Sequence, residues 1–489
     1  MVEIKNVSFK YEGGECDTLK NISLTVPAGK VVVLVGESGC GKTTITRLIN
    51  GLIPYYYKGE LNGSVFINGK SIEEISFYAI SETVGSVFQN PRAQFFNVDT
   101  SAELAFECEN RGMSKKEIEK RVTDTVEKFR IENLMKRSIF ELSGGQKQKI
   151  ACASVSVSEP SIYVMDEPSS NLDMEGTREL KDCISRWKKE GKSIIVSEHR
   201  LSYLREVADE IVYVKDGSIA EVFTVAEFSS LSKHKLDAMG LRPMTGEQFN
   251  RNVERRRAIS YGEVKLSNFN FAYKNGVKVL NIEKGTLPLR EVVAIIGHNG
   301  AGKSTFARCL CGLERKCKGI VEYEGAKQKN RERLKKCYMV MQDVNHQLFT
   351  ESVLDEVLIS MVKEDEKVAE KILKSLDLIK YKDRHPMSLS GGQKQRTAIA
   401  SAMAAGRDIM IFDEPTSGLD LYHMKEVAEN ISRLQNDGRS VFVVTHDLEL
   451  ILTSCTTVLR LEKGEICEQY PLDNDGVRRV IDFFEEGIK

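Results

Sequence analysis

The segment Leu142-Ser-Gly-Gly-Gln-Lys-Gln148 occurs a second time, letter for letter, at Leu389–Gln395. The serines of the two copies, Ser143 and Ser390, lie 247 positions apart. The same spacing separates two further pairs of positions: Asp166 and Asp413, which each begin an Asp-Glu-Pro triplet, and His199 and His446. Several motifs repeated at one fixed distance indicate a duplicated domain, so we expect two similar halves in this chain.

The size and composition of the chain agree with two globular domains. It has 489 residues, of which 41% are apolar and 29% are charged, and its net charge is -1. This composition excludes a disordered chain, and the charge gives no general attraction to nucleic acid. The 11 cysteines are too sparse for a disulfide scaffold, so we expect reduced thiols. No apolar run approaches the roughly 20 residues that span a bilayer, and the first residues do not resemble a signal peptide.

Each half contains one glycine-rich loop that fits the pattern GxxxxGK[ST], at Gly36–Thr43 and at Gly297–Ser304. Both loops follow apolar, strand-like segments, Lys30–Val35 and Arg290–Ile296. Glycines let successive backbone N–H groups point at phosphate oxygens, while the lysine neutralises phosphate charge and the hydroxyl can reach Mg²⁺. The residues expected to bind a nucleotide here are Gly36, Glu37, Ser38, Gly39, Cys40, Gly41, Lys42, Thr43 and Thr44, with Gly297, His298, Asn299, Gly300, Ala301, Gly302, Lys303, Ser304 and Thr305 in the second half.

A pair of acidic residues follows a second apolar strand in each half. Asp166-Glu167 follows Ser161–Met165, and Asp413-Glu414 follows Asp408–Phe412. The aspartate is placed to hold Mg²⁺, and the glutamate can polarise an attacking water. We therefore expect Glu167 and Glu414 to be catalytic.

The order of these motifs resembles the ATP-binding cassette (ABC) ATPases, over nearly the whole chain. The resemblance implies an α/β fold with two P-loop NTPase domains in tandem, each with a RecA-like core, an antiparallel β subdomain and a helical subdomain. We expect the first domain at 1–235, a connector at 236–260 that includes the basic run Arg255–Arg257, and the second domain at 261–489. The helical stripes Ile118–Phe129 and Val368–Leu376 should belong to the core of the helical subdomains.

The resemblance also assigns roles that the residues alone do not. Gln89 and Gln342 become the glutamine-loop residues, Tyr11 and Tyr273 the aromatic residues that stack on adenine, and His199 and His446 the histidines that contact the γ-phosphate. It implies ATP and Mg²⁺ as ligands. The residues expected around the metal are Thr43, Gln89, Asp166, Ser304, Gln342 and Asp413.

In this family the LSGGQ segment of one cassette closes over the nucleotide bound by the other. The resemblance therefore implies two composite sites within one polypeptide. Lys42, Thr43, Asp166 and Glu167 would pair with Ser390, Gly391, Gly392 and Gln393, and the corresponding residues of the second half would pair with Ser143, Gly144, Gly145 and Gln146. No catalytic position is replaced in either half, and Asn171 against Gly418 is a small difference, so we expect both sites to hydrolyse ATP.

The sequences around the two glutamine-loop residues indicate which subclass of ABC ATPases this chain resembles. Gln89–Phe96, together with Glu103–Asn110 and Gly51–Gly63, resembles the ATPases of energy-coupling-factor (ECF) importers of vitamins and metals. Gln342–Phe349 is similar but lacks the proline. This resemblance implies a polytopic membrane scaffold subunit and a small substrate-binding membrane subunit as partners, no nucleic acid, and a peripheral location on the cytoplasmic face of the membrane.

Several alternatives stay open at this point. The apolar residues Phe95, Phe96, Leu348 and Phe349 either line a groove for scaffold helices or are buried. A tandem-cassette ATPase could also act on the ribosome as a translation factor, or serve another type of ABC transporter. The transported substrate cannot be read from this chain. If the Cys40 thiol is accessible, its alkylation should block one site.

Overall fold

The computed structural model describes the chain except residues 171, 250–261, 274–275 and 489. The expectations for Asn171 and for Arg255–Arg257 therefore lie outside the described residues. Among the helices that are described, none is both long enough and apolar enough to cross a bilayer.

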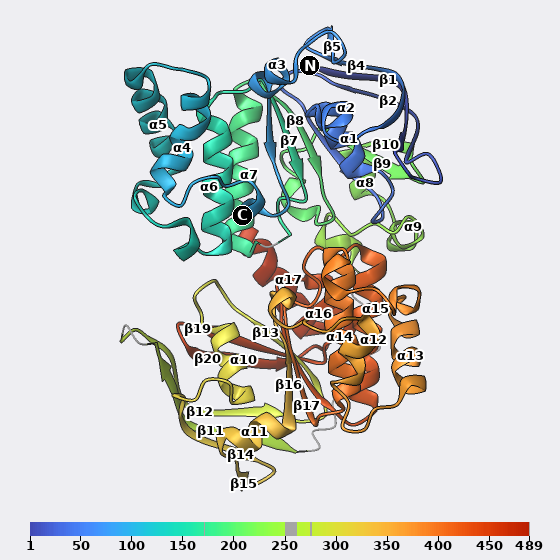
Figure 1. Cartoon of the computed structure of the whole chain (residues 1–489). Coiled ribbons are helices and arrows are strands. Elements are labelled where there is room, and N and C mark those ends of the chain that lie inside the picture. The colour runs from blue at the N-terminus through green and yellow to red at the C-terminus, as the bar shows by residue number, and fades with distance from the viewer. Residues whose placement is uncertain (171, 250–261, 274–275, 489) are drawn as a thin grey trace. The chain divides into compact units, whose positions relative to one another are not determined.

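The chain divides into two compact units, Met1–Phe249 with Gly487–Lys489, and Asn250–Glu486 (Figure 1). Each unit combines a six-stranded sheet, a four-stranded antiparallel sheet and a set of helices. The predicted α/β fold with two tandem P-loop domains is confirmed. Leu236, Leu241 and Met244 lie in the core of the first unit. The domain boundaries at 235 and 261 stay a proposal.

In the first unit the six-stranded sheet has the order β10-β9-β3-β8-β7-β6 and is parallel except for β10. Its strands are β3 (Val31–Val35), β6 (Val84–Val87), β7 (Ile162–Asp166), β8 (Ser193–Ser197), β9 (Glu210–Lys215) and β10 (Ser218–Thr224). The antiparallel sheet has the order β2-β1-β4-β5 and consists of β1 (Val2–Tyr11), β2 (Leu19–Val26), β4 (Gly59–Ile67) and β5 (Lys70–Ser71).

The helices of the first unit fall into those around the sheets and those of a helical subdomain between β6 and β7 (Figure 1). The first group is α1 (Lys42–Ile49), α2 (Leu52–Tyr55), α3 (Phe77–Thr83), α7 (Met174–Lys189), α8 (Val225–Ser229) and α9 (Lys233–Ala238). The subdomain contains α4 (Thr100–Asn110), α5 (Lys115–Phe129) and α6 (Gly144–Val157).

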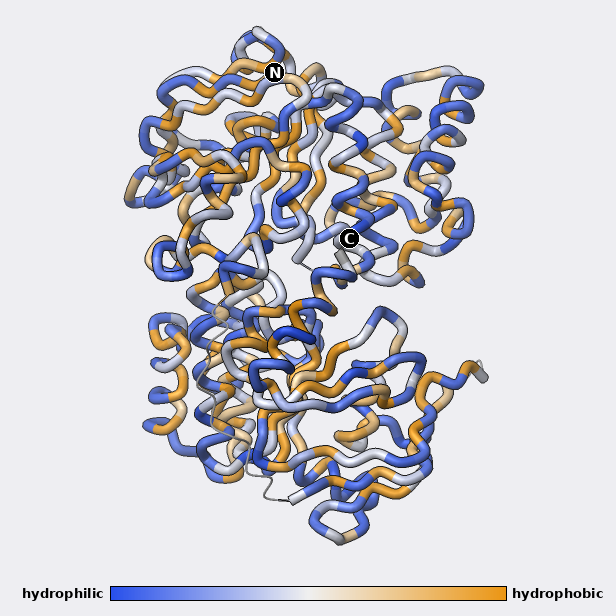
Figure 2. Tube along the Cα trace, turned by 180° about the vertical axis from the view of Figure 1, so that it is seen from behind, coloured by the Kyte–Doolittle hydropathy of each residue, from blue (hydrophilic) through white to orange (hydrophobic). Residues whose placement is uncertain are grey.

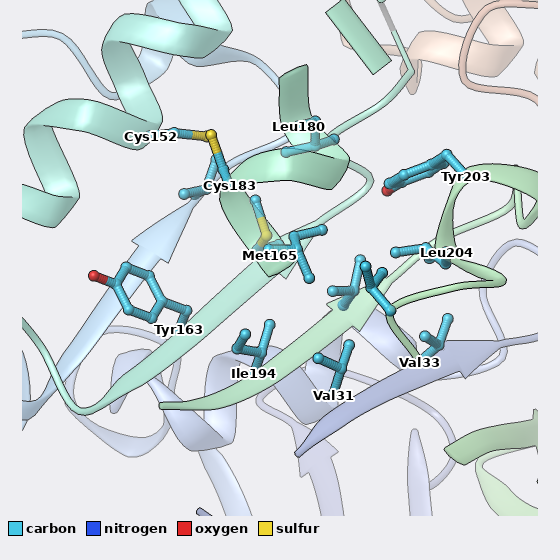
Figure 3. Packing of buried hydrophobic residues seen from close by; sticks show 14 of the residues in the cluster. Val31, Val33, Cys152, Tyr163, Met165, Leu180, Cys183, Ile194, Tyr203 and Leu204 are labelled. Atoms are coloured by element: carbon cyan, nitrogen blue, oxygen red, sulfur yellow. The ribbon is translucent and has the colours of Figure 1, made fainter. Parts of the chain in front are cut away.

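Alternating side chains of β3 supply the two halves of the core. Val31, Val33 and Val35 belong to a cluster with Leu180 and other residues of α7. The intervening Val32 and Leu34 belong to a second cluster with Ile45 and Leu48 of α1. A strand that is buried on both faces reads as a continuous apolar run, which is why the sequence Val-Val-Val-Leu-Val forms the centre of the sheet. Figure 3 shows Val31, Val33 and Ile194 on the strands with Leu180 and Cys183 on the helix above them.

The second unit repeats this arrangement. Its six-stranded sheet has the order β16-β17-β18-β13-β19-β20, with only β20 antiparallel to its neighbour, and its smaller sheet has the order β12-β11-β14-β15. The strands are β11 (Glu263–Ala272), β12 (Lys278–Pro288), β13 (Val292–Ile296), β14 (Lys318–Tyr323), β15 (Ala326–Lys327), β16 (Cys337–Val340), β17 (Ile409–Asp413), β18 (Ser440–Val444), β19 (Thr457–Glu462) and β20 (Glu465–Pro471). The helices are α10 (Lys303–Cys311), α11 (Asn330–Lys336), α12 (Val353–Leu358), α13 (Glu366–Ser375), α14 (Gly391–Ala405), α15 (Leu421–Asn436), α16 (Leu448–Ser454) and α17 (Asn474–Ile488), which belongs to this unit up to Glu486.

One residue of the predicted core stripe Val368–Leu376 is wrong, whereas Leu376 at its end is buried as expected. The sequence pattern placed Val368 on the inward face of a helix, but Val368 is 47% exposed. The buried residues of α13 are Ala369 and Leu373, followed by Leu376 just beyond the helix. Small Ala369 therefore faces the core, and the expectation was misled by the larger Val368. In Figure 2 hydrophobic and hydrophilic residues alternate along much of the trace of each unit.

Candidate functional site

The two glycine-rich loops connect the central strand of each sheet to the helix that follows it. The loop after β3 leads into α1 at Lys42, and the loop after β13 leads into α10 at Lys303. Lys42 Nζ donates to the carbonyl oxygens of Gly36 and Glu37 at 2.8 and 2.9 Å. Lys303 Nζ donates to those of Gly297 and His298 at 2.8 and 3.0 Å. Both ammonium groups are thus held inside the curl of their own loop, where a phosphate would be bound.

The first glycine of each loop is required by a close backbone contact. Gly36 has φ +152°, and a Cβ there would lie 2.3 Å from the carbonyl oxygen of Val214 in β9. Gly297 has φ +147°, and its Cβ would lie 2.0 Å from the carbonyl oxygen of Leu461 in β19. Neither space accepts a side chain, so the loop can approach the adjacent strand only with glycine at this position.

The residue after each lysine donates a hydrogen bond to the aspartate at the end of the neighbouring strand. Ser304 Oγ donates to Asp413 Oδ1 at 3.1 Å, and the Thr43 hydroxyl donates to Asp166. Burial raises the pKa of both aspartates, against the lowering effect of these hydroxyl bonds and of the nearby lysines. A divalent cation beside them would favour the ionised carboxylates, so the residues fit Mg²⁺.

This donor set suits a cation that is also bound by phosphate. Among the described residues, no group of three or more His, Cys, Asp or Glu side chains could hold a metal by itself. A hydroxyl and one carboxylate per unit leave the remaining coordination positions to water and phosphate oxygens, as Mg²⁺ prefers.

Glu167 and Glu414 adopt left-handed backbone conformations, with φ of 44° and 51°. A glutamate in this region is uncommon and costs roughly 1–2 kcal/mol. The conformation is held by a hydrogen bond from each amide to the adjacent strand, Glu167 N to Ser197 O and Glu414 N to Val444 O, both at 2.8 Å. The strain is therefore repeated in both units and lies at the expected catalytic carboxylates.

A histidine approaches each of these glutamates. His199 Nε2 lies 3.3 Å from Glu167 Oε1, and His446 Nε2 lies 3.7 Å from Glu414 Oε1. Gln89 also reaches this group in the first unit, where its Nε2 donates to Glu167 Oε2 at 2.7 Å. Gln342 is exposed two residues after β16. The structure thus brings together the predicted glutamate and histidine in each unit, and the glutamine in the first.

The two tyrosines expected at the adenine are tied to the helix after the loop. Tyr11 Oη lies 3.1 Å from Thr44 Oγ1, and Tyr273 Oη lies 3.1 Å from Thr305 Oγ1. In the first unit Arg47 adds a hydrogen bond of 2.9 Å to Tyr11 Oη. Tyr273 is 43% exposed, which leaves part of its surface available to a base.

The repeated LSGGQ segments form the first turns of α6 and α14. Ser143 caps α6 by accepting from Gln146 N, while Gln146 Oε1 accepts from Ser143 N at 3.1 Å. Ser390 and Gln393 form the same capping box on α14. Both serines are exposed. These segments therefore present helix N-termini at the surface, where backbone N–H groups suit an anion.

Two buried glutamates shape the loops that follow Gln89 and Gln342. Glu103 Oε2 accepts from the amides of Phe96 and Asn97 at 3.1 and 2.8 Å. Glu356 Oε2 accepts in the same way from Phe349 and Thr350, both at 3.0 Å. Neither glutamate was expected at the site from its sequence motif. The sequence did contain a shared feature that could have indicated them: Glu103 follows Phe96, and Glu356 follows Phe349, at the same distance of seven positions.

The phenylalanines of these loops face solvent. Phe96 is 76% exposed and stacks on Phe106, and Phe349 is 72% exposed. Their neighbours Phe95 and Leu348 instead pack inward. Burial is thus confirmed for Phe95 and Leu348 and is wrong for Phe96 and Phe349, for which the groove stays a prediction. The missing proline does not change the second loop, since Val344 begins the same short 3-10 turn that Pro91 begins in the first.

Cys40 is buried within the first loop. Its side chain is 8% exposed, and burial raises the pKa of its thiol despite the nearby Lys42. A buried thiol with a raised pKa reacts poorly, so the condition for blocking the site by alkylation is not met in this structure.

The comparisons with known proteins agree with this geometry. The family model described as "ABC transporter" matches residues 19–170 and 280–417. A relative from Treponema denticola, named as an ABC transporter ATP-binding protein, is 44% identical over 96% of this chain and 97% of its own length. A second protein of that name and organism is 36% identical over 97% of each chain.

Two solved structures share the architecture at low identity. A ribosome-bound archaeal Pelota and ABCE1 model matches with a TM-score of 0.72 and 22% identity, over 98% of this chain and 80% of that one. The archaeal ribosome recycling factor aABCE1, in complex with stalk protein aP1, matches with a TM-score of 0.67 and 22% identity, over 98% and 92%. At this identity the likeness concerns the fold alone.

Proposed function

Because the chain belongs to the ABC transporter family and carries two copies of its ATP-binding cassette, we propose that it is the energy-coupling ATPase subunit of an ECF-type membrane importer. The family binds ATP. The coupling of its hydrolysis to uptake of a vitamin or metal, and a location on the cytoplasmic face of the membrane through partner subunits, are parts of this proposal.

In the proposed reaction each unit holds one ATP. Lys42 and Lys303 would neutralise charge on the phosphates, and Thr43 with Asp166, or Ser304 with Asp413, would hold Mg²⁺. The metal supplies charge neutralisation at the phosphate oxygens when bound. Glu167 and Glu414 accept a proton from the attacking water, and His199 and His446 orient the developing phosphate.

We further propose that each site is completed by the LSGGQ segment of the other unit. Ser143 and Ser390 are exposed at helix N-termini, where their neighbouring amides can bind a γ-phosphate. Fusion of the two units in one chain raises the effective concentration of the second unit. Tyr11, Tyr273, Gln89 and Gln342 keep the roles expected for them as part of the same proposal.

The observation that carries the membrane role is the pair of exposed phenylalanines beside the glutamine loops. Phe96 and Phe349 are more than 70% exposed, and each lies on a loop that a buried glutamate holds in place. Large apolar side chains on a fixed loop suit a groove for an amphipathic helix. In the first unit this loop begins at Gln89, which contacts Glu167, so a partner could influence hydrolysis directly.

The test is purification of the full chain from its native membranes, followed by site-specific crosslinking from Phe96→Cys and Phe349→Cys. We expect co-purification with a polytopic subunit, and crosslinks from the two positions to different segments of it. Val222→Cys, which is 54% exposed in β10, is the matched control and should not crosslink. Recovery with ribosomes instead of membranes would contradict the importer and favour a translation factor.

A further inference from the structure

Glu198 is a buried carboxylate that the roles described so far do not use. It is 2% exposed and lies between Ser197, the last residue of β8, and His199. Its own amide donates to the carbonyl oxygen of Leu34 in β3 at 3.1 Å. The backbone of Glu198 is therefore fixed beside the strand that leads into the phosphate-binding loop.

The carboxylate of Glu198 accepts four hydrogen bonds from three segments. Oε1 accepts from the amides of His199 and Arg200 at 2.8 and 3.2 Å. Oε2 accepts from the Ser169 amide at 3.3 Å and from the Tyr203 hydroxyl at 3.0 Å. Tyr203 belongs to the buried cluster shown in Figure 3. A carboxylate is acceptor-only when ionised and can satisfy four donors, so this set of contacts is complete.

These bonds join the two segments that carry the expected catalytic groups. Ser169 follows Glu167 by two residues, and His199 lies 3.3 Å from Glu167 through its Nε2 atom. A shift of either segment would change the distance between the histidine and the glutamate. Glu198 accepts its bonds from three backbone amides and from the Tyr203 hydroxyl, so its influence acts through the positions of its neighbours.

The second unit makes the same connection with a carboxylate on the other side of its histidine. Thr445 stands where the first unit has Glu198, and Asp447 stands where it has Arg200. Asp447 is 3% exposed, and its Oδ2 accepts from Thr416 Oγ1 at 2.8 Å. Thr416 corresponds to Ser169 at the spacing of the repeat. Both units thus use one buried carboxylate next to the histidine to hold the segment after the catalytic glutamate.

We propose that Glu198 is the positioning residue of the first ATP site: it holds His199 and the segment after Glu167 in register, as Asp447 holds the segment after Glu414 in the second site. This inference rests on the proposed ATPase function of Glu167 and His199. It does not depend on the membrane partners.

The test moves the buried carboxylate from position 198 to position 200 in the full-length chain. Glu198→Thr should lower kcat by about 10-fold to 100-fold, on the scale of a misplaced catalytic group, with the KM for ATP changed less than about twofold. Glu198→Thr combined with Arg200→Asp recreates the arrangement of the second unit and should return kcat to within about threefold of the parent chain. Melting temperature and binding of a fluorescent ATP analogue are measured for each variant.

The matched control makes the reverse exchange in the second unit. Asp447→Arg should lower kcat, and Thr445→Glu with Asp447→Arg should restore it. An unchanged kcat for Glu198→Thr would overturn the inference, as would failure of the exchange variant to restore kcat although it binds the analogue and melts as the parent does. Recovery of the parent chain with ribosomes instead of membranes would instead contradict only the proposed importer.

Discussion

The side-chain amide of Gln89 donates a hydrogen bond of 2.7 Å to the Glu167 carboxylate. Gln89 begins the loop that carries exposed Phe96, and Glu167 is the expected general base. The bond therefore connects the surface proposed for a partner with the group proposed for catalysis. Withdrawal of the loop would release one oxygen of the carboxylate towards the attacking water.

The first prediction concerns the two glutamates. Glu167→Gln and Glu414→Gln should each lower turnover by about 10²-fold or more, since the amide cannot accept the proton from water. The measurement is steady-state ATPase activity of the full chain, with ATP binding as a control for folding. If one replacement has almost no effect, the two sites are unequal and hydrolysis at one of them is dispensable.

A second prediction concerns Asp209, which fixes the start of β3. Its carboxylate lies 3.0 Å from Lys30 Nζ and 2.8 Å from Lys188 Nζ, and it accepts from the Val31 amide at 2.9 Å. Partial burial alone would raise the pKa of Asp209, but the Lys188, Val31 and Lys30 contacts outweigh this and lower it. The ionised form is therefore favoured by folding.

Because the folded pKa is below the unfolded value of about 3.9, this stabilisation is present above that pH and is lost as pH falls through the folded pKa. Asp209→Asn should destabilise the protein by about 1.5–3 kcal/mol at pH 7, and the difference should disappear at low pH. Denaturant unfolding as a function of pH measures this. Exposed Asp124→Asn on α5 is the control, with a change within about 0.5 kcal/mol. A difference that does not depend on pH would show that charge is not the cause.

The third prediction concerns the buried Glu103. Glu103→Ala leaves the amides of Phe96 and Asn97 without their acceptor, at a cost of about 1–3 kcal/mol. Hydrogen exchange of residues 96 and 97 should become faster, and recovery with membranes should fall, while ATP binding by the isolated chain is retained. Glu109→Ala, at an exposed position of α4, is the matched control. Unchanged exchange at 96 and 97 would contradict the role assigned to Glu103.

A fourth prediction distinguishes two reasons why replacing a glycine destabilises the protein: a close contact of the added Cβ atom, and an unfavourable backbone conformation. Gly36→Ala places a Cβ 2.3 Å from Val214 O, whereas at Gly191, with φ +76°, nothing lies within 4 Å of the added atom. Gly191→Ala should cost about 1–2 kcal/mol from its left-handed conformation. Gly36→Ala should cost at least about 2 kcal/mol more and weaken ATP binding, because the strand must move. Similar melting temperatures for the two variants would contradict the requirement for glycine at 36.

Much of the fold could be predicted from the sequence because it rests on local patterns. The apolar runs at 31–35, 162–165 and 409–412 form strands as expected, and each glycine-rich loop joins a strand to a helix. One residue of a helical stripe was wrong: Val368 was expected in the core, but it is exposed and the helix buries Ala369 instead. Burial depends on what faces a residue, and a single helical stripe does not contain that information.

The candidate site likewise contains residues that the sequence predicted and residues that it did not. The lysines, hydroxyls, carboxylates and histidines come from motifs with a fixed spacing. Glu103, Glu198 and Glu356 were missed, because each acts by accepting backbone hydrogen bonds from segments whose position only the folded chain defines. The distinction between exposed Phe96 and inward-packed Phe95 likewise depends on the loop conformation that Glu103 imposes.

We propose that the LSGGQ segment of each unit completes the nucleotide-binding site of the other unit. Crosslinking tests it most directly, in a chain with exposed Cys16 and Cys467 replaced by serine and with Glu167→Gln to slow hydrolysis. Ser38→Cys combined with Ser390→Cys should form a disulfide in the presence of Mg²⁺ and ATP but not without nucleotide. Ser38→Cys combined with Ser143→Cys, within one unit, should not. A disulfide between 38 and 143, or none between 38 and 390 in chains that have bound ATP, would contradict the claim.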